Sequence, residues 1–261
     1  MCSVTSISNS HVVFVAHGSR AARWVEAQQQ WWGGVNERLL RETNGALTSE
    51  LTFLEIADPL FDDCLARLKN QQKSLLIFPF FLSQSGHATE DIPEILEKHL
   101  QPEQYTLLKP TGWTGVLARN FDRRVLEYGG TPEDPVIISG YGASHHDHLW
   151  QQMILDIQAC SQLYQDQPNW HWAPSGHFFE DFTVPLRNCL KTVSETHERC
   201  VVFPLYLAVS SYQEKLIPET SAEFPKLTVL TAKDSILPDP LVEEWAAGQV
   251  LLHYKEECSR A

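Results

Sequence analysis

The chain has 261 residues, of which 43% are hydrophobic and 20% are charged, the balance of an ordinary globular protein with a buried core. Its formal net charge of −13 argues against a nucleic-acid partner, because no part of the sequence forms a basic face. The apolar runs are too short for a membrane span, and the amino terminus lacks the basic segment of a signal peptide. We therefore expect a cytoplasmic protein with no membrane partner.

The first half of the chain contains short apolar stretches that do not alternate with polar residues. These runs predict buried strands at 12–16, 51–56, 75–80 and 105–108. Between these runs, apolar residues recur with the period of a helix. One example is the stripe of Ile92, Leu96 and Leu100, and Pro93 beside it suits the first turn of a helix. Buried strands joined by helices are typical of a parallel sheet covered on both faces.

The second half repeats this order. Further apolar runs predict strands at 136–140, 200–204 and 227–231. The stretch 78–94 aligns with 203–219 at an offset of 125, without a gap, and seven of the seventeen positions are identical. A turn-rich segment, 128–135, separates the copies. We therefore predict an α/β protein with two tandem lobes, 9–128 and 135–256.

The six cysteines are scattered and none forms a CxxC pair. This distribution favours buried, reduced thiols over a disulfide framework or a zinc knuckle, which agrees with a cytoplasmic location.

A histidine follows the first predicted strand. His17 stands at the carboxyl end of the run 12–16, and ligands of open α/β sheets bind at that edge. Gly18 and Ser19 lead into the next helix and are candidates to present backbone N–H groups to a carboxylate. Arg20 and Arg23 supply local positive charge that the whole chain lacks. A helix cap beside a surface histidine is the plainer interpretation of the same residues.

Two further polar side chains follow other strands of the first half. Glu55 closes the second predicted strand, and His87 lies in the loop after the third. Because the carboxyl ends of parallel strands share one edge, His17, Glu55 and His87 are predicted to converge there. Two imidazoles and a carboxylate suit a divalent first-row metal, and they also suit proton removal near neutral pH.

The second lobe does not repeat this set. Tyr141 stands in place of His17 and Tyr212 in place of His87, so that Glu180 alone is retained. Other histidines of this lobe are candidates for accessory contacts, although a solvated helix start explains them as well: His145, His146, His148 and His177.

Three blocks in the first half, VVFVAHGSR, FLEIADPLFDDCL and FPFFLSQSGHATEDIPEIL, together resemble the class II tetrapyrrole chelatase family, and especially its sirohydrochlorin cobalto- and ferrochelatases. The resemblance covers roughly residues 11–128, with a degenerate echo in the second lobe. It implies two flavodoxin-like lobes that face each other across a cleft for the macrocycle. It also implies ATP-independent insertion of Co²⁺ or Fe²⁺ into sirohydrochlorin, in cobalamin or siroheme biosynthesis.

Residue by residue, the resemblance implies that His17 and His87 bind the metal and that Glu55 is the site glutamate. The loop that precedes His87 is expected to contact the substrate together with the first loop, which gives the predicted substrate-binding set Gly18, Ser19, Arg20, Ser83, Gln84, Ser85 and Gly86. The sequence departs from the family where Gly-Gly-His becomes Ser85-Gly86-His87. Four aromatic residues are candidates for the cleft wall: Trp24, Trp31, Trp32 and Phe81.

Several alternatives remain open at this point. A non-catalytic carrier of a tetrapyrrole or a metal on the same scaffold would carry the same motifs, and so would a chelatase for another macrocycle. Cobalt, iron and nickel accept similar nitrogen and oxygen ligands, so the residues do not select among them. We expect no tightly bound cofactor, since the divalent metal is a substrate. A monomer suffices for a complete cleft, because both lobes lie in one chain.

Overall fold

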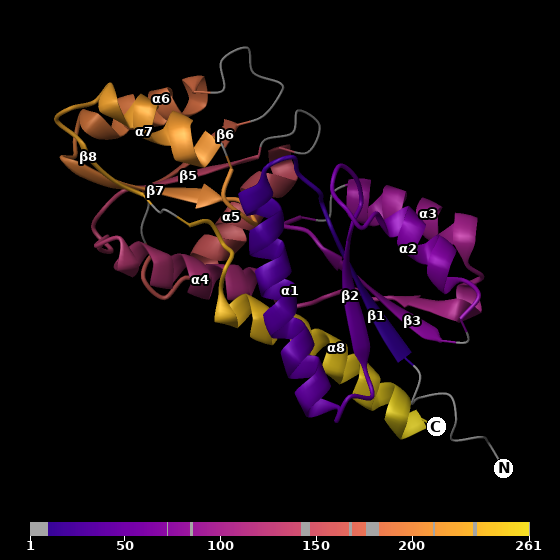
Figure 1. Ribbon diagram of the computed structural model, residues 1–261. Helices are drawn as coiled ribbons and strands as arrows, with labels where there is room; N and C mark the ends of the chain where they lie inside the picture. Colours follow the sequence, from indigo (N-terminus) through magenta and orange to yellow (C-terminus); the bar gives the residue numbers. More distant parts are fainter. Residues whose placement is uncertain are drawn as a thin grey trace. The chain divides into compact units, whose positions relative to one another are not determined.

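A computed structural model describes residues 10–71, 73–83, 86–141, 147–166, 169–175, 183–210, 212–231 and 234–260 (Figure 1). The chain forms two compact units. Unit 1 contains the residues up to Thr111 together with those from Asp239 onward, and unit 2 is Gly112–Pro238.

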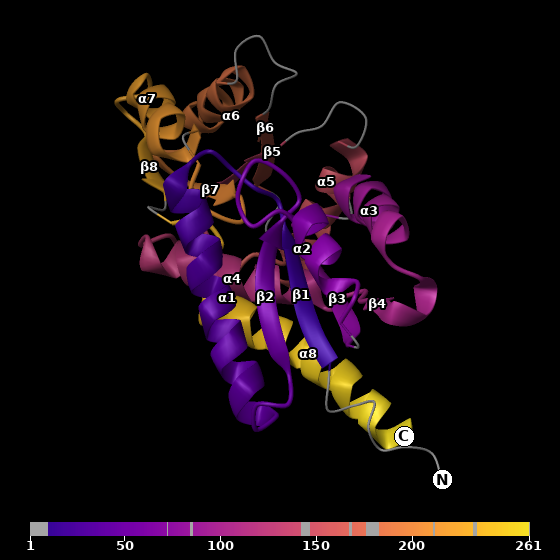
Figure 2. The same ribbon diagram turned by 45° about the vertical axis from the view of Figure 1, so that its right-hand side comes forward.

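Unit 1 is a three-layer α/β structure. Its elements are β1 (Ser10–Ala16), α1 (Ala22–Glu42), β2 (Thr48–Phe53), α2 (Phe61–Leu68), β3 (Ser74–Phe80), the π-helical turn η2 (His87–Asp91), α3 (Ile92–His99), the 3₁₀ turn η3 (Pro102–Gln104), β4 (Tyr105–Leu107) and α8 (Pro240–Arg260). The four strands are parallel in the order β2-β1-β3-β4. Helices α2 and α3 cover one face of the sheet, while α1 and α8 contact each other on the opposite face (Figures 1 and 2).

Successive residues of the central strands enter different cores, which explains why their sequence does not alternate. Val13 and Val15 of β1 pack with α2 and α3. Phe14, between them, points to the other face, where its ring contacts Trp31 of α1 edge-on at 5.5 Å. All three side chains are fully buried, so an apolar residue is favoured at each position.

Unit 2 repeats this plan. Its elements are α4 (Trp113–Glu127), β5 (Val136–Tyr141), α5 (Asp147–Cys160), β6 (Trp170–Ser175), α6 (Val184–Ser194), β7 (Arg199–Leu205), the π-helical turn η4 (Tyr212–Leu216), α7 (Ile217–Ala222) and β8 (Thr228–Thr231). The strands are again parallel, in the order β6-β5-β7-β8. Helices α6 and α7 pack on one face, and α4 contacts α5 and β7.

Two helices are exchanged between the sequence halves. The ring of Phe121 in α4 lies 5.0 Å from that of Phe203 in β7, so α4 belongs to unit 2 although it precedes the repeat boundary. In turn, Trp245 of α8 contacts Phe78 of β3 at 5.7 Å. The compact units therefore differ from the predicted contiguous lobes 9–128 and 135–256. A turn-rich segment marks where a repeat ends, but packing decides which sheet a flanking helix covers.

The predicted fold class is confirmed: two parallel α/β sheets of equivalent order, each flanked by helices. The strand β6 was missing from the prediction because its sequence, WHWAPS, is not a continuous apolar run. Among the described cysteines all thiols are free, but Cys160 and Cys258 are exposed, so burial was predicted correctly for only part of the set.

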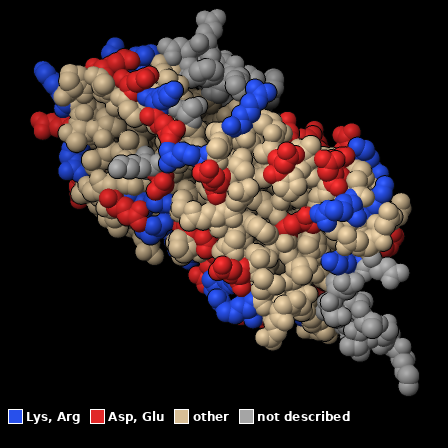
Figure 3. Space-filling model, in the orientation of Figure 1, with Lys and Arg blue, Asp and Glu red and all other residues tan. Residues whose placement is uncertain are grey.

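The surface carries the mixture of acidic and basic side chains that the composition predicts (Figure 3). In the view of Figure 3, acidic side chains are scattered among lysines and arginines over the visible face. Within the ranges that the structure describes, none of the helices is both long enough and apolar enough to cross a membrane.

Candidate metal site

The candidate site lies where the strand order of unit 1 reverses. The chain leaves β1 toward β2 on one side, and β3 lies on the other side of β1. In open α/β sheets such a switch point leaves a crevice beyond the carboxyl ends of the two strands, and ligands bind in it. His17 follows β1 directly, and the loop after β3 leads to His87. The topology thus brings the two predicted histidines to one place.

His17 and Glu55 form a close pair. The Nε2 atom of His17 lies 3.2 Å from Oε1 of Glu55, and their side chains are 34% and 52% exposed. The Nδ1 atom of His17 lies 2.7 Å from the carbonyl oxygen of Gly18, to which it donates when it carries the ring proton. In that tautomer the lone pair on Nε2 faces a carboxylate, an arrangement that a bound cation or a second proton stabilises.

Gly18 makes this pair possible through close packing. A Cβ atom at this position would lie 1.7 Å from the carbonyl oxygen of Glu55, so only glycine allows the loop after β2 to approach. The carbonyl of His17 accepts hydrogen bonds from the side chains of Trp24, at 3.3 Å, and Gln28, at 3.5 Å. Gly18 is buried, which corrects the expectation of an open backbone cradle at this residue.

His87 completes the group. Its ring centroid lies 5.0 Å from that of His17, and the two planes meet at 74°. The Nδ1 atom of His87 lies 2.6 Å from Oδ2 of Asp91, so the carboxylate holds the ring proton on Nδ1 and leaves Nε2 with a free lone pair. Asp91 was not predicted from the sequence. Its spacing of four residues from His87 in a helical stretch is the signal that identifies it.

Both His87 and Asp91 belong to the π-helical turn η2, which leads into α3. The N–H of Ile92 donates to the carbonyl of His87, five residues earlier, and the next residue, Pro93, has no N–H to donate. A wide turn before a proline avoids the clash between its ring and the preceding carbonyls. Local sequence therefore fixes the backbone on which the histidine and its partner are held.

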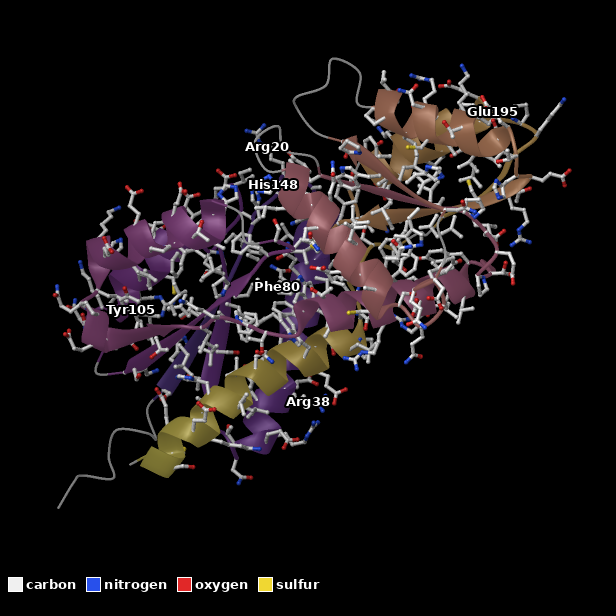
Figure 4. All side chains as sticks on the ribbon, turned by 180° about the vertical axis from the view of Figure 1, so that it is seen from behind. Arg20, Arg38, Phe80, Tyr105, His148 and Glu195 are labelled. Atoms are coloured by element: carbon white, nitrogen blue, oxygen red, sulfur yellow. The ribbon has the colours of Figure 1, made fainter. Side chains whose placement is uncertain are left out.

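The other predicted binding residues lie in the loops after β1 and β3, and they differ in their exposure and contacts. The hydroxyl of Ser19 accepts a hydrogen bond from the backbone N–H of Ala21 at 3.1 Å, and the helix α1 begins one residue later with no side-chain cap. Arg20 is exposed in the loop after β1 (Figure 4). Ser83 and Gly86 are half-buried in the loop after β3. Gln84 and Ser85 lie outside the described residues.

The four candidate aromatic residues divide into two groups. Trp24 lies beside His17 through its hydrogen bond, and the Phe81 ring lies 6.3 Å from that of His87. Trp31 is fully buried and stacks on Phe80 at 3.7 Å, in the interior that Figure 4 shows around Phe80, so it belongs to the core. Trp32 donates to Ser49 near the start of β2, at the amino end of the strand.

The site is open rather than a closed coordination shell. Across the described parts of the chain, no group of three or more histidine, cysteine, aspartate or glutamate residues is arranged to hold a metal ion. His17, His87 and Glu55 are neighbours, but they do not form a complete ligand set.

The corresponding edge of unit 2 carries tyrosines. Tyr141 ends β5, where it is 46% exposed, and Tyr212 begins η4. His148 lies exposed near the start of α5. The remaining predicted residues of this edge fall outside the described part of the chain: His145, His146, His177 and Glu180.

Comparison with known proteins gives a family match in the first half of the chain and fold matches over nearly all of the chain. Residues 11–128 match the CbiX family. The sirohydrochlorin chelatase SirB from Bacillus subtilis subspecies spizizenii, solved with cobalt, is 17% identical, with a TM-score of 0.67 over 95% of this chain and 96% of that chain. SirB from Bacillus subtilis with Fe³⁺ is 18% identical, with a TM-score of 0.67 over 93% and 94%.

A third structure, CbiX, the terminal enzyme for biosynthesis of siroheme in denitrifying bacteria, is 12% identical, with a TM-score of 0.61 over 94% of this chain and 98% of that chain. A search of curated proteins gave no match. At these identities the structural likeness establishes the fold. The match of residues 11–128, which contain both histidines, to the CbiX family confirms the resemblance to class II tetrapyrrole chelatases predicted from the motifs.

Proposed function

We propose that the protein is a sirohydrochlorin chelatase, an enzyme that inserts Co²⁺ or Fe²⁺ into a carboxylate-rich tetrapyrrole without ATP. The observation that carries this proposal is the group His17, Glu55 and His87 at the switch point of unit 1, within the segment that matches the CbiX family. Solved structures of the same fold include SirB with cobalt and with Fe³⁺, which supports a first-row metal as the substrate.

The two histidines are proposed to hold the incoming metal ion. Asp91 keeps the ring proton of His87 on Nδ1, and the Gly18 carbonyl does the same for His17, so both Nε2 atoms are free to bind. A metal that is passed on must not be held too firmly. The incomplete ligand set is consistent with this requirement, because open positions allow the pyrrole nitrogens to replace water.

Glu55 is proposed to accept a proton. Insertion exchanges two pyrrole N–H protons for one divalent cation, so the overall charge balances when both protons leave. The carboxylate of Glu55 is half exposed beside Nε2 of His17, and it can therefore take a proton from the site and pass it to water. Arg20 is proposed to attract the carboxylates of the macrocycle, in a chain whose net charge of −13 otherwise repels them.

Anaerobic metallation tests this function. Purified protein is mixed with sirohydrochlorin and an excess of Co²⁺ or Fe²⁺, and the absorption spectrum reports the metallated product. We expect many turnovers per protein and loss of activity in the double variant His17→Ala, His87→Ala, with circular dichroism confirming that the variant is folded. Metallation by this variant at the parent rate would refute the assignment of the site.

The same assay separates an enzyme from a carrier of tetrapyrrole or metal. A carrier gives a single spectral change equal to the protein concentration, whereas an enzyme continues beyond it. Running the assay with Ni²⁺ and with a porphyrin of the haem pathway then defines the metal and the macrocycle.

We also propose that the enzyme acts in the cytoplasm, without a tightly bound cofactor, and as a monomer. The presence of two units with equivalent strand order in one chain supports the last point. Sedimentation at several protein concentrations tests it, and a concentration-dependent dimer would contradict it.

A further inference from the structure

One residue beside the candidate site has a backbone conformation that its side chain does not favour. Ile56, which directly follows Glu55, has a φ of 69°. A β-branched residue rarely adopts a positive φ, because its side chain then crowds the adjacent backbone. The other described residues with a positive φ are an asparagine and three glycines, which tolerate it: Asn44, Gly45, Gly112 and Gly129. Among the described residues, strain of this kind is therefore confined to the position next to Glu55.

Ile56 is the central residue of a tight three-residue turn. The backbone N–H of Ala57 donates to the carbonyl of Glu55 at 2.8 Å, which closes a γ-turn over Ile56. A γ-turn with a positive φ at its centre is rare and strained. The turn reverses the chain immediately after Glu55, whose carboxylate lies 3.2 Å from Nε2 of His17. The strained residue therefore sets the backbone direction at the site glutamate.

The surrounding structure holds this turn in place. Both atoms of its hydrogen bond lie against Gly18, since a Cβ atom there would be 1.7 Å from the Glu55 carbonyl oxygen and 2.9 Å from the Ala57 nitrogen. Just before the turn, the N–H of Leu54 donates to the carbonyl of Ala16 at 2.8 Å. Strained conformations persist where the neighbouring structure determines them, and these contacts do so here.

Packing does not explain an isoleucine at this position. The Ile56 side chain is 53% exposed, so its burial offsets little of the backbone cost. Glycine would adopt the same φ without strain, but it would also leave the turn free to take other conformations. An isoleucine restricts the turn, because its side chain leaves the backbone few accessible conformations. The residue thus gives up stability in return for a stiff turn beside Glu55.

We propose that Ile56 is a positioning residue that acts through Glu55: the stiff turn fixes the Glu55 carboxylate beside His17, where its negative charge stabilises the incoming metal ion. The inference rests on the proposed function, which supplies that metal ion as a substrate. A carboxylate held in one place beside a cation stabilises it more than one that samples several positions, so a looser turn weakens metal binding.

Calorimetric titration with Co²⁺ tests the inference, since it measures metal affinity without any turnover. In Ile56→Gly we expect the dissociation constant of Co²⁺ to rise about tenfold, because the turn is no longer stiff. Ile56→Ala keeps a Cβ atom without most of the side chain, and its affinity should stay within about threefold of the parent. Asn44→Gly is the matched control, because it changes another residue of positive φ in unit 1, between α1 and β2, and should leave Co²⁺ affinity unchanged.

A double-mutant cycle shows whether Ile56 acts through Glu55. In a Glu55→Gln background, Ile56→Gly should cause no further loss of Co²⁺ affinity, because the charge that the turn positions is already absent. Thermal unfolding of Ile56→Gly alone provides a second measurement. Its unfolding temperature should match or exceed that of the parent, since glycine removes the strain.

Three results would overturn the inference: parental Co²⁺ affinity in Ile56→Gly, an equal loss in the Glu55→Gln background, or a clear drop in unfolding temperature. An Ile56→Ala variant as weak as Ile56→Gly would also overturn it, because the effect would then belong to the side chain and not to the turn. The proposed function fails by a different result, namely a parent that binds Co²⁺ and never metallates sirohydrochlorin. In that case the Co²⁺ titrations still decide the role of Ile56.

Discussion

The two π-helical turns, η2 in unit 1 and η4 in unit 2, share their backbone and differ in their chemistry. Both follow a central strand, and both lead into a helix through Ile-Pro-Glu. Yet η2 begins with His87 and ends with its partner Asp91, whereas η4 begins with Tyr212 and ends with Leu216.

This comparison separates what the fold requires from what the reaction requires. In both units the π-helical turn lies between a buried strand and a proline, and these two features determine its backbone. The turn is therefore retained in any copy of the repeat that retains them. The side chains that the turn presents are free to change. A duplicated scaffold can therefore keep one metal site and devote the other edge to a different interaction.

The largest effect is expected when unit 1 is made to resemble unit 2. His87→Tyr replaces a metal ligand by a neutral phenol on the same turn, so we expect metallation to fall by about 100-fold or more while the turn is retained. Initial rates with Co²⁺ measure the loss, and Phe81→Leu serves as a control for the neighbouring ring. Activity within threefold of the parent would show that His87 is not a ligand.

A smaller loss is expected when only the orientation of His87 is disturbed. In Asp91→Asn the amide no longer holds the ring proton as a carboxylate does, so metal affinity should fall between about 10-fold and 100-fold. Titration with Co²⁺ at fixed pH measures this affinity. Asp91→Glu should restore part of it, a rescue that a purely structural role would not produce.

A third prediction concerns a charged network of unit 1 that lies away from the site. Nε2 of His11 lies 2.7 Å from Glu50, which also pairs with Arg67, whereas Pro135 takes the place of His11 in the repeat. Burial alone would raise the pKa of Glu50, but the hydrogen bond and charge of His11, together with Arg67, lower it below 4.5.

Since the folded-state pKa of Glu50 is depressed, its stabilisation is present above pH 4.5 and is lost as the pH falls through the folded value. Glu50→Gln should therefore lower the free energy of unfolding by about 1 kcal/mol at pH 7. Urea unfolding at descending pH checks this. A difference that grows below pH 4.5 would contradict the sign of the shift.

The smallest effect is expected when a histidine is returned to unit 2. Tyr212→His lacks an equivalent of Asp91, because Leu216 cannot orient the ring, so Co²⁺ binding should stay at one ion per chain. Calorimetric titration gives the stoichiometry. If a second ion bound with similar affinity, the orienting carboxylate would be unnecessary.

The sequence predicted the fold and the convergence of three site residues, because both follow from regular features. Unalternating strands indicate a parallel sheet, and residues that follow such strands must share an edge. It did not predict that α4 and α8 are exchanged, since an apolar helix face does not specify which sheet it covers. Nor did it predict that Gly18 is buried, because that depends on the close approach of a loop from another strand.

The exchange of α4 and α8 has a consequence for folding during translation. The ribosome completes every element of unit 2 before it makes α8, so unit 2 has its full core while the sheet of unit 1 still lacks α8, one of the two helices on its face. Trp31, Val35 and Leu39 of α1 are fully buried in the finished protein. Unit 2 is therefore the first unit whose elements are all synthesised, so it can fold before unit 1 is complete. A nascent chain arrested before Asp239 should expose apolar surface on unit 1 alone.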